Sequence, residues 1–237
     1  MIVSGGKQVY GASIGILMLE ARFPRIPGDM GNAGTWDFPV LYKVVEDASP
    51  DLIVRRGAEG MLEPFIQAGR DLIRQGVDAI TTNCGFLATF QAELSEALSV
   101  PVATSALMQV PMVQALLPPG KRVGLITISA ETMTPEHLVA AGCPPDLPIV
   151  GTEGGEAFTA SILGDALTLD VDASRRDLIA AGKQMVAQNP DVGAIVLECT
   201  NMPPYQRDVA VAVGLPVFSM VDYVCWLQAG LSPRRYE

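Results

Sequence analysis

The stretches VDAITTNCGF, at residues 77–86, and VGAIVLECTN, at residues 192–201, decide the predicted fold. Each is typical of a buried strand that ends in a cysteine, Cys84 in the first stretch and Cys199 in the second. The offset from 84 to 199 is 115 positions, and it continues without a gap into the next apolar run of each half. Between residues 77 and 102, the pairs identical at this offset are Val77 and Val192, Ala79 and Ala194, Ile80 and Ile195, Cys84 and Cys199, Gln91 and Gln206, Ala97 and Ala212, Pro101 and Pro216, and Val102 and Val217. One structural unit therefore occurs twice.

Apolar runs alternate with helical patterns along both halves of the 237 residues. This alternation predicts an α/β fold with two pseudo-symmetric lobes, each a mostly parallel sheet flanked by helices. We assign residues 1–105 and 218–237 to the first lobe and residues 106–217 to the second. Ligands of such sheets bind beyond the carboxyl ends of the strands, so the active site is expected in the cleft between the lobes.

The first lobe should begin with a strand over residues 9–19, a continuous apolar run. Residues 20–38 are rich in proline and glycine and predict a long loop, which at this length is commonly a lid or a binding loop. A helix over residues 40–46 and a short second strand over residues 52–55 are expected to follow.

The composition argues against several classes of protein. A formal charge of −10 and a pI near 4.6 oppose nucleic-acid binding, which needs clustered lysine and arginine. The longest apolar run is too short to span a bilayer, so we expect a cytoplasmic protein without a membrane partner. Four cysteines without a CxxC pair, and one histidine, support neither a metal site nor a disulfide framework. A homo-oligomer is compatible with the sequence.

Cys84 and Cys199 are the candidate catalytic residues. A cysteine between a strand end and a helix start lies near main-chain N–H groups and a helix dipole, both of which favour the thiolate. Two such groups on opposite faces of a small carbon acid could invert a stereocentre by two-base proton transfer, without a cofactor. The developing enolate-like charge would need donors, and four neighbours of the thiols could supply them. These neighbours are Asn83, Gly85, Thr200 and Asn201.

A structural interpretation competes with this one, because cysteine is among the most buried residue types. The matched placement of Cys84 and Cys199 favours function, since a packing residue has no reason to recur at a strand end. Cys143 and Cys225 have no partner in the repeat and are expected to be structural. His137 lies in a predicted helix, and we expect it at the surface, remote from both motifs.

TNCG at residues 82–85, ECTN at residues 198–201 and the strand that opens the second half resemble the aspartate/glutamate/hydantoin racemase superfamily over essentially the whole chain. The resemblance implies a PLP-independent isomerase in which Cys84 and Cys199 are the acid/base thiols. It also implies that polar residues after strand ends hold the substrate carboxylate, including Thr127 and Ser129. The expected partner is a small amino-acid-like or hydantoin-like carboxylate.

The chain departs from that family at the motifs. Gly85 and Phe86 follow the first cysteine, and this pair predicts more room and less polarity beside Cys84. Asn201 stands where the family often has an ionisable residue, and an amide cannot carry a proton. A helper for the thiols must therefore lie elsewhere. The candidates are Glu198, Asp29 and Glu20, each expected to be a solvated loop charge.

Basic residues that could grip a carboxylate occur in two places. The loop at residues 20–38 offers Arg22 and Arg25, and a surface loop with solvated arginines is the equally weighted alternative. Arg55 follows the predicted second strand, at the binding edge of the sheet.

Two other functions fit the same motifs. Because the two cysteine motifs differ, a decarboxylase or a cis–trans isomerase of a small dicarboxylate could use a single catalytic cysteine. In a two-lobed binding protein without chemistry, the thiols would only line the cleft.

Overall fold

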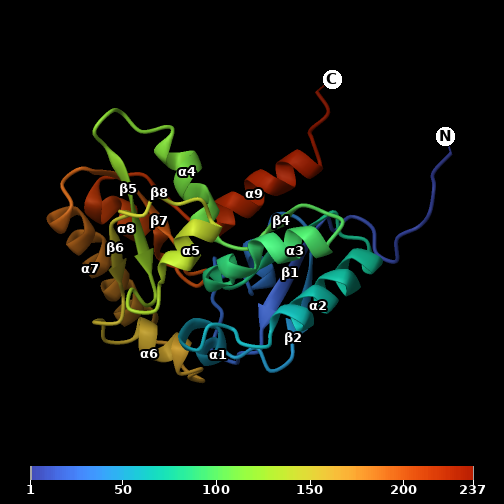
Figure 1. Cartoon of the computed structure of the whole chain (residues 1–237), viewed down its shortest axis with the longest axis horizontal. Helices are drawn as coiled ribbons and strands as arrows, with labels where there is room; N and C mark the ends of the chain where they lie inside the picture. The colour runs from blue at the N-terminus through green and yellow to red at the C-terminus, as the bar shows by residue number, and fades with distance from the viewer. Residues whose placement is uncertain (1, 237) are drawn as a thin grey trace.

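The computed structural model describes residues 2–236 and contains two four-stranded parallel sheets (Figure 1). The first has the order β2-β1-β3-β4 and the second the order β6-β5-β7-β8, so both lobes use one topology. The strands are β1 (Ile14–Leu19), β2 (Val40–Val45), β3 (Ala79–Thr82), β4 (Val102–Ala103), β5 (Arg122–Thr127), β6 (Ile149–Gly151), β7 (Val192–Leu197) and β8 (Val217–Phe218). The α/β prediction is confirmed.

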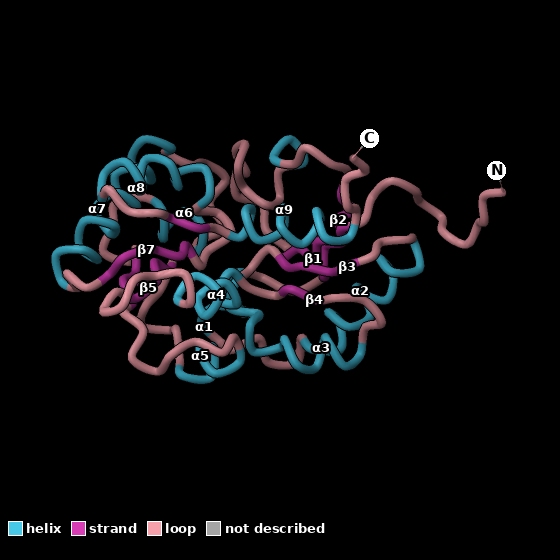
Figure 2. Tube along the Cα trace, turned by 90° about the horizontal axis from the view of Figure 1, so that it is seen from above, coloured by secondary structure: helices cyan, strands magenta, loops and turns pink. Residues whose placement is uncertain are grey.

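Helices surround both sheets, as the view from above shows (Figure 2). They are α1 (Pro50–Arg55), α2 (Leu62–Gln75), α3 (Gln91–Ala97), α4 (Gln109–Gln114), α5 (Pro135–Ala140), α6 (Phe158–Leu163), α7 (Val171–Gln188), α8 (Gln206–Val213) and α9 (Met220–Leu231). The inner strands β1, β3, β5 and β7 are almost entirely buried, which explains their continuous apolar sequences. Within residues 2–236, no helix is long and apolar enough to cross a membrane.

The glutamines of the sequence repeat make the same hydrogen bond in both lobes. Gln91 donates its side-chain amide to the carbonyl of Val102 over 3.0 Å, and Gln206 donates to the carbonyl of Val217 over 2.8 Å. Each bond ties the helix that follows a cysteine motif to the short strand at the edge of its sheet. The identities at the 115-residue offset thus preserve one way of joining helix to sheet.

Two predicted elements of the first lobe are wrong. Residues 40–46, expected as a helix, contain β2, because β-branched and aromatic residues favour a strand that pairs with β1 in register. Residues 52–55, expected as a strand, belong to α1. Ser49 caps that helix by accepting a hydrogen bond from the N–H of Leu52, and Pro50 occupies the first turn.

The strand expected over residues 9–19 begins only at Ile14. Val9 and Tyr10 are exposed, and Gly11 has a φ of 89°, which interrupts extended structure. The predicted loop at residues 20–38 contains one short 3₁₀ turn, Ala33–Thr35. This segment is called the cleft loop below.

The chain passes between the sheets twice, after β4 and after β8. Gln109 on α4 donates its side-chain amide to the carbonyl of Ser219, just before α9, over 2.9 Å, and both residues are buried. In both views α9 runs beside the first sheet (Figures 1 and 2), and it shares a surface hollow with Asp37 and Phe38. The exact lobe boundaries stay a prediction.

Candidate active site

Cys84 and Cys199 line the same cavity, at the carboxyl ends of β3 and β7. The chain turns identically after each, since the carbonyl of Cys84 accepts the N–H of Leu87 over 3.1 Å and that of Cys199 accepts the N–H of Met202 over 3.0 Å. The cavity holds about 20 Å³ of free space, room for about one water molecule. Its lining residues are Leu19, Phe23, Arg25, Pro50, Val54, Asn83, Cys84, Gly85, Phe86, Ile128, Ile162, Leu163, Glu198, Cys199 and Asn201.

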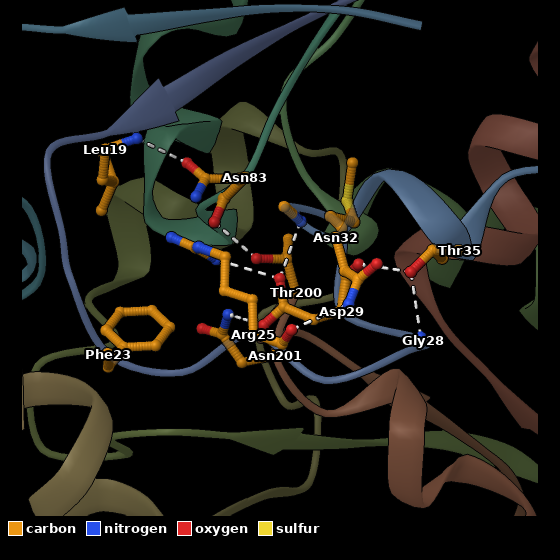
Figure 3. A network of polar contacts seen from close by, with 12 residues as sticks. Leu19, Phe23, Arg25, Gly28, Asp29, Asn32, Thr35, Asn83, Thr200 and Asn201 are labelled. Carbon is orange, nitrogen blue, oxygen red and sulfur yellow. Dashed lines mark hydrogen bonds and ion pairs between the residues drawn. The ribbon is translucent and has the colours of Figure 1, made fainter. Parts of the chain in front are cut away.

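The two cysteine motifs are bonded to each other across the lobes. The hydroxyl of Thr200 donates to the carbonyl of Asn83 over 2.5 Å (Figure 3). The side-chain oxygen of Asn83 accepts the N–H of Leu19 over 2.7 Å, which fixes the orientation of its amide group. Asn83, Gly85 and Asn201 line the cavity as predicted, whereas Thr200 lies behind it and positions the motifs.

Burial in this cavity disfavours the thiolates that local dipoles were expected to favour. Burial and, to a lesser degree, the charge of Glu198 raise the pKa of Cys84 to about 12. The main-chain N–H groups after Cys84 lower that pKa but do not outweigh burial. Burial and Glu198 also raise the pKa of Cys199 well above its ordinary value.

Glu198 is buried beside both thiols rather than solvated, with 1% of its surface exposed. Its Oε2 accepts the hydroxyl of Thr127 over 2.8 Å, while its Oε1 has no hydrogen-bond partner among residues 2–236. Burial raises the pKa of Glu198 to about 7. A Cβ on Gly85 would lie 2.1 Å from Oε1, so this carboxyl fills the room predicted beside Cys84.

A chain of polar contacts leads from Cys199 to the cleft loop, and Figure 3 shows its Asn201, Asp29 and Arg25 members. The Cys199 thiol donates to Oδ1 of Asn201 over 3.4 Å, and Nδ2 of Asn201 donates to Asp29 over 2.6 Å. Asp29 also pairs with Arg25 at 2.9 Å. Since only the nitrogen of the Asn201 amide can donate to Asp29, its oxygen must face the thiol. Asp29, 3% exposed, is therefore not a solvated charge.

Arg25 is the basic residue that reaches the cavity. Its guanidinium carbon lies 4.4 Å from the centre of the Phe23 ring, and only one of its nitrogens bonds Asp29. Figure 3 shows the guanidinium and the Asn83 amide facing one another. Arg22 and Arg55, both predicted to bind substrate, lie outside the cavity: Arg22 is exposed beside Asp165, and Arg55 pairs with Asp51 on α1.

Of the remaining predicted residues, Thr127 reaches the site through Glu198, and Ser129 is buried behind it with its N–H directed at Thr127. Glu20 is exposed and accepts the N–H of Asp47. His137 is not at the surface, because its ring packs edge-on against Phe86, 5.0 Å between centroids.

Several apolar residues of the lining were missed. Ile162 and Leu163 belong to α6, an element that was not expected, and Phe23 belongs to the cleft loop. These residues meet the cavity from different lobes, and no local pattern in the sequence marks such a meeting. The burial of Glu198 had one signal, its place beside Cys199 at the end of an apolar strand.

The cavity brings groups that could accept a proton, the two thiols and the Glu198 carboxyl, together with groups that could bind a carboxylate. Free N–H groups of Arg25 and Asn83 can hold an anionic oxygen in the cavity that both thiols line. Removal of a proton from the carbon next to that carboxylate is the chemistry that these groups can share.

Comparison with known proteins identifies sequence relatives that are named dimethylsulfoniopropionate lyases. The dimethylsulfoniopropionate lyase of Durusdinium sp. clade D is 32% identical over 222 residues, which cover 89% of this chain and 72% of that protein. Dimethylsulfoniopropionate lyase 6 of Emiliania huxleyi (strain CCMP1516) is 33% identical over 224 residues, covering 88% of this chain. The chain spans 57% of that second relative's length.

Solved structures share the fold at low sequence identity. A mutant of arylmalonate decarboxylase, in its sulfate-associated form, superposes with a TM-score of 0.65 at 17% identity, over 94% of this chain and 95% of that one. Glutamate racemase RacE1 from Bacillus anthracis gives 0.62 at 16% identity, over 93% and 81%. Residues 46–227 match the model of the family described as Asp/Glu/Hydantoin racemase. The chain therefore belongs to the Asp/Glu/Hydantoin racemase family.

Proposed function

We propose that this protein is a lyase that cleaves dimethylsulfoniopropionate by removing a proton next to the carboxylate and expelling dimethyl sulfide. The observation that carries the proposal is the similarity to the Durusdinium lyase across 89% of the chain. The cavity supports it, because a thiol, a buried carboxyl and a guanidinium surround one small space. Membership of an enzyme family supports catalysis over simple binding.

The first step of this reaction is shared with racemisation. A base takes the proton on the carbon next to the carboxylate, and the N–H groups of Arg25 and Asn83 stabilise the charge that develops on the carboxylate oxygens. In a racemase the same carbon then regains a proton from the opposite face. Here the electron pair of the C–H bond instead forms the C=C bond of acrylate. The neighbouring C–S bond breaks, and its electron pair leaves with dimethyl sulfide.

Cys84 is the better-placed base. The main-chain N–H groups of Phe86 and Leu87 lower its pKa, and these donors would hold the thiolate once a cationic substrate enters. Cys199 has one such donor, the main-chain N–H of Asn201, and its own proton goes to the side chain of Asn201, which Asp29 holds in place. An elimination needs one proton acceptor, so the two cysteines should contribute unequally.

Headspace gas chromatography of dimethyl sulfide, with acrylate measured by NMR, tests the proposal. The wild-type protein should release both from dimethylsulfoniopropionate in equal amounts. Cys84→Ser should lower kcat by about 10²- to 10⁴-fold, the usual size of a general-base contribution, and Cys199→Ser should lower it less. A wild-type protein that releases no dimethyl sulfide would refute the lyase.

The two-base racemase or epimerase is the second candidate, favoured by the two thiols that line one cavity. It predicts exchange of the α-hydrogen in heavy water when amino acids or hydantoins are supplied. It also predicts equal loss in the two serine variants. A single-cysteine decarboxylase is a further candidate, because the fold of this chain resembles that of arylmalonate decarboxylase. Release of carbon dioxide from small dicarboxylates would identify this activity.

A further inference from the structure

Glu198 presents an unpaired carboxyl oxygen inside the cavity. Thr127 holds Oε2, and Oε1 has no hydrogen-bond partner among the described residues. An unpaired buried charge is costly, and native structures rarely keep one without a use for it. The free oxygen therefore marks a place for a group that the protein itself does not provide.

Residues 2–236 supply no cation to this oxygen. Glu198 takes part in none of the ion pairs between them. Arg25 is the one basic residue among those that line the cavity, and it is paired with Asp29. When Glu198 is ionised, none of these residues neutralises it, so the ligand is the remaining source of a positive charge.

Glu198 cannot easily swing away to another partner. Its carboxyl presses on the backbone beside Cys84, where a Cβ in place of the Gly85 hydrogen would lie 2.1 Å from Oε1 and 2.8 Å from Cδ. Thr127 anchors the other oxygen from β5. The free oxygen is thus held in place between the two lobes.

The other side-chain amide oxygens of the cavity each accept one hydrogen bond already. Oδ1 of Asn201 accepts the Cys199 thiol, and Oδ1 of Asn83 accepts the N–H of Leu19. A primary ammonium brings three N–H donors and needs several acceptors. A sulfonium or a quaternary ammonium brings charge without donors, and one carboxylate oxygen satisfies it.

We propose that Glu198 is a specificity-determining residue that receives an onium group without N–H donors, while Arg25 and Asn83 hold the carboxylate at the other end of the substrate. The inference deepens the proposed lyase and rests on it for the identity of the sulfonium. It predicts that ordinary amino acids are poorer substrates, since their ammonium groups would find fewer free acceptors than their three N–H donors need.

Matched pairs of ligands test the role of charge alone. Replacing the onium atom by an uncharged carbon while keeping the carboxylate turns dimethylsulfoniopropionate into its isostere 4-methylpentanoate, and 3-(trimethylammonio)propanoate into its isostere 4,4-dimethylpentanoate. Calorimetric titration in a Cys84→Ser background avoids turnover of the sulfonium. That background should bind each cation at least about tenfold more tightly than its isostere, and Glu198→Gln should reduce the ratio to near one by weakening cation binding alone. Glu20→Gln, which changes an exposed carboxyl, should leave the ratio unchanged.

If Glu198→Gln weakened the binding of both members of each pair equally, Glu198 would have a structural role and the inference would be overturned. It would also be overturned if a protein with Glu198 intact bound cation and isostere alike, a result that stands even if Glu198→Gln fails to fold. The proposed lyase activity is tested by a different result from the one that tests the onium site. If the wild-type protein releases no dimethyl sulfide but prefers both cations, the lyase is refuted and the onium site is retained.

Discussion

At the scale of single residues, the buried Glu198 makes stability depend on pH. Burial raises its pKa in the folded protein from the ordinary 4.5 to about 7, so the folded state keeps a proton that the unfolded chain has lost. This contribution to stability is complete below pH 4.5 and is lost as the pH rises through about 7. The thiols of Cys84 and Cys199 stay protonated throughout this window.

We therefore expect the free energy of unfolding of the wild-type protein to fall relative to that of Glu198→Gln between about pH 4.5 and about pH 8. The expected change is about 3 kcal/mol, since one pKa unit corresponds to about 1.4 kcal/mol. Urea denaturation of both proteins across this range measures it. A constant difference would contradict a buried, titrating Glu198.

At the scale of elements, the cleft loop is tied to the second lobe by Asp165, which follows α6. One carboxylate oxygen of Asp165 accepts the N–H groups of Arg22 and Phe23, over 2.5 and 3.0 Å. Asp165 has a φ of 48°, a conformation that glycine and asparagine also adopt. Replacement by either residue therefore tests the carboxylate without straining the backbone.

Asp165→Gly removes the acceptor and should loosen the loop. We expect a loss of about 1 kcal/mol in stability, a raised KM, and faster hydrogen exchange at the amides of Arg22 and Phe23. Asp165→Asn keeps an acceptor oxygen and should remain close to wild type. If Asp165→Gly exchanges these amides at the wild-type rate, the tether does not hold the loop.

At the scale of the whole molecule, the bond from Thr200 to Asn83 joins the two cysteine motifs across the lobes. Thr200→Val should cost about 1–3 kcal/mol, because a buried carbonyl loses its donor, and should lower kcat by misplacing the thiols. Thr81→Val is the matched control, since its buried hydroxyl donates to Ala103 over 2.8 Å within the first sheet. It should cost a similar amount of stability and leave kcat unchanged. An equal kcat in Thr200→Val and Thr81→Val would show that the contact between Thr200 and Asn83 does not affect catalysis.

Features that the sequence repeat encodes were predicted correctly. Features that depend on contacts between distant segments were not. The alternation of strands and helices, and the meeting of Cys84 and Cys199, follow from the 115-residue offset and from parallel topology. The helix predicted at residues 40–46 and the strand predicted at residues 52–55 were assigned the wrong way round, because short apolar runs fit a strand or a helix equally well.

Burial of charge was beyond reach of the sequence. Glu198 and Asp29 follow apolar or loop residues in their own lobes, yet each is covered by a segment from the other lobe. Arg25, rather than Arg22 or Arg55, reaches the cavity because the cleft loop folds back through Asp29. The thiols were expected to ionise on the basis of local dipoles, and burial in a closed space reversed that expectation.

The bond between Gln109 and Ser219 bears on how a substrate enters a space that holds about one water molecule. It fastens together the two places at which the chain passes from one sheet to the other. Because the two connecting segments are held together, we expect the sheets to rotate about them rather than to slide or twist past each other. We therefore expect the lobes to part at the thiols, on the side of the molecule away from this bond.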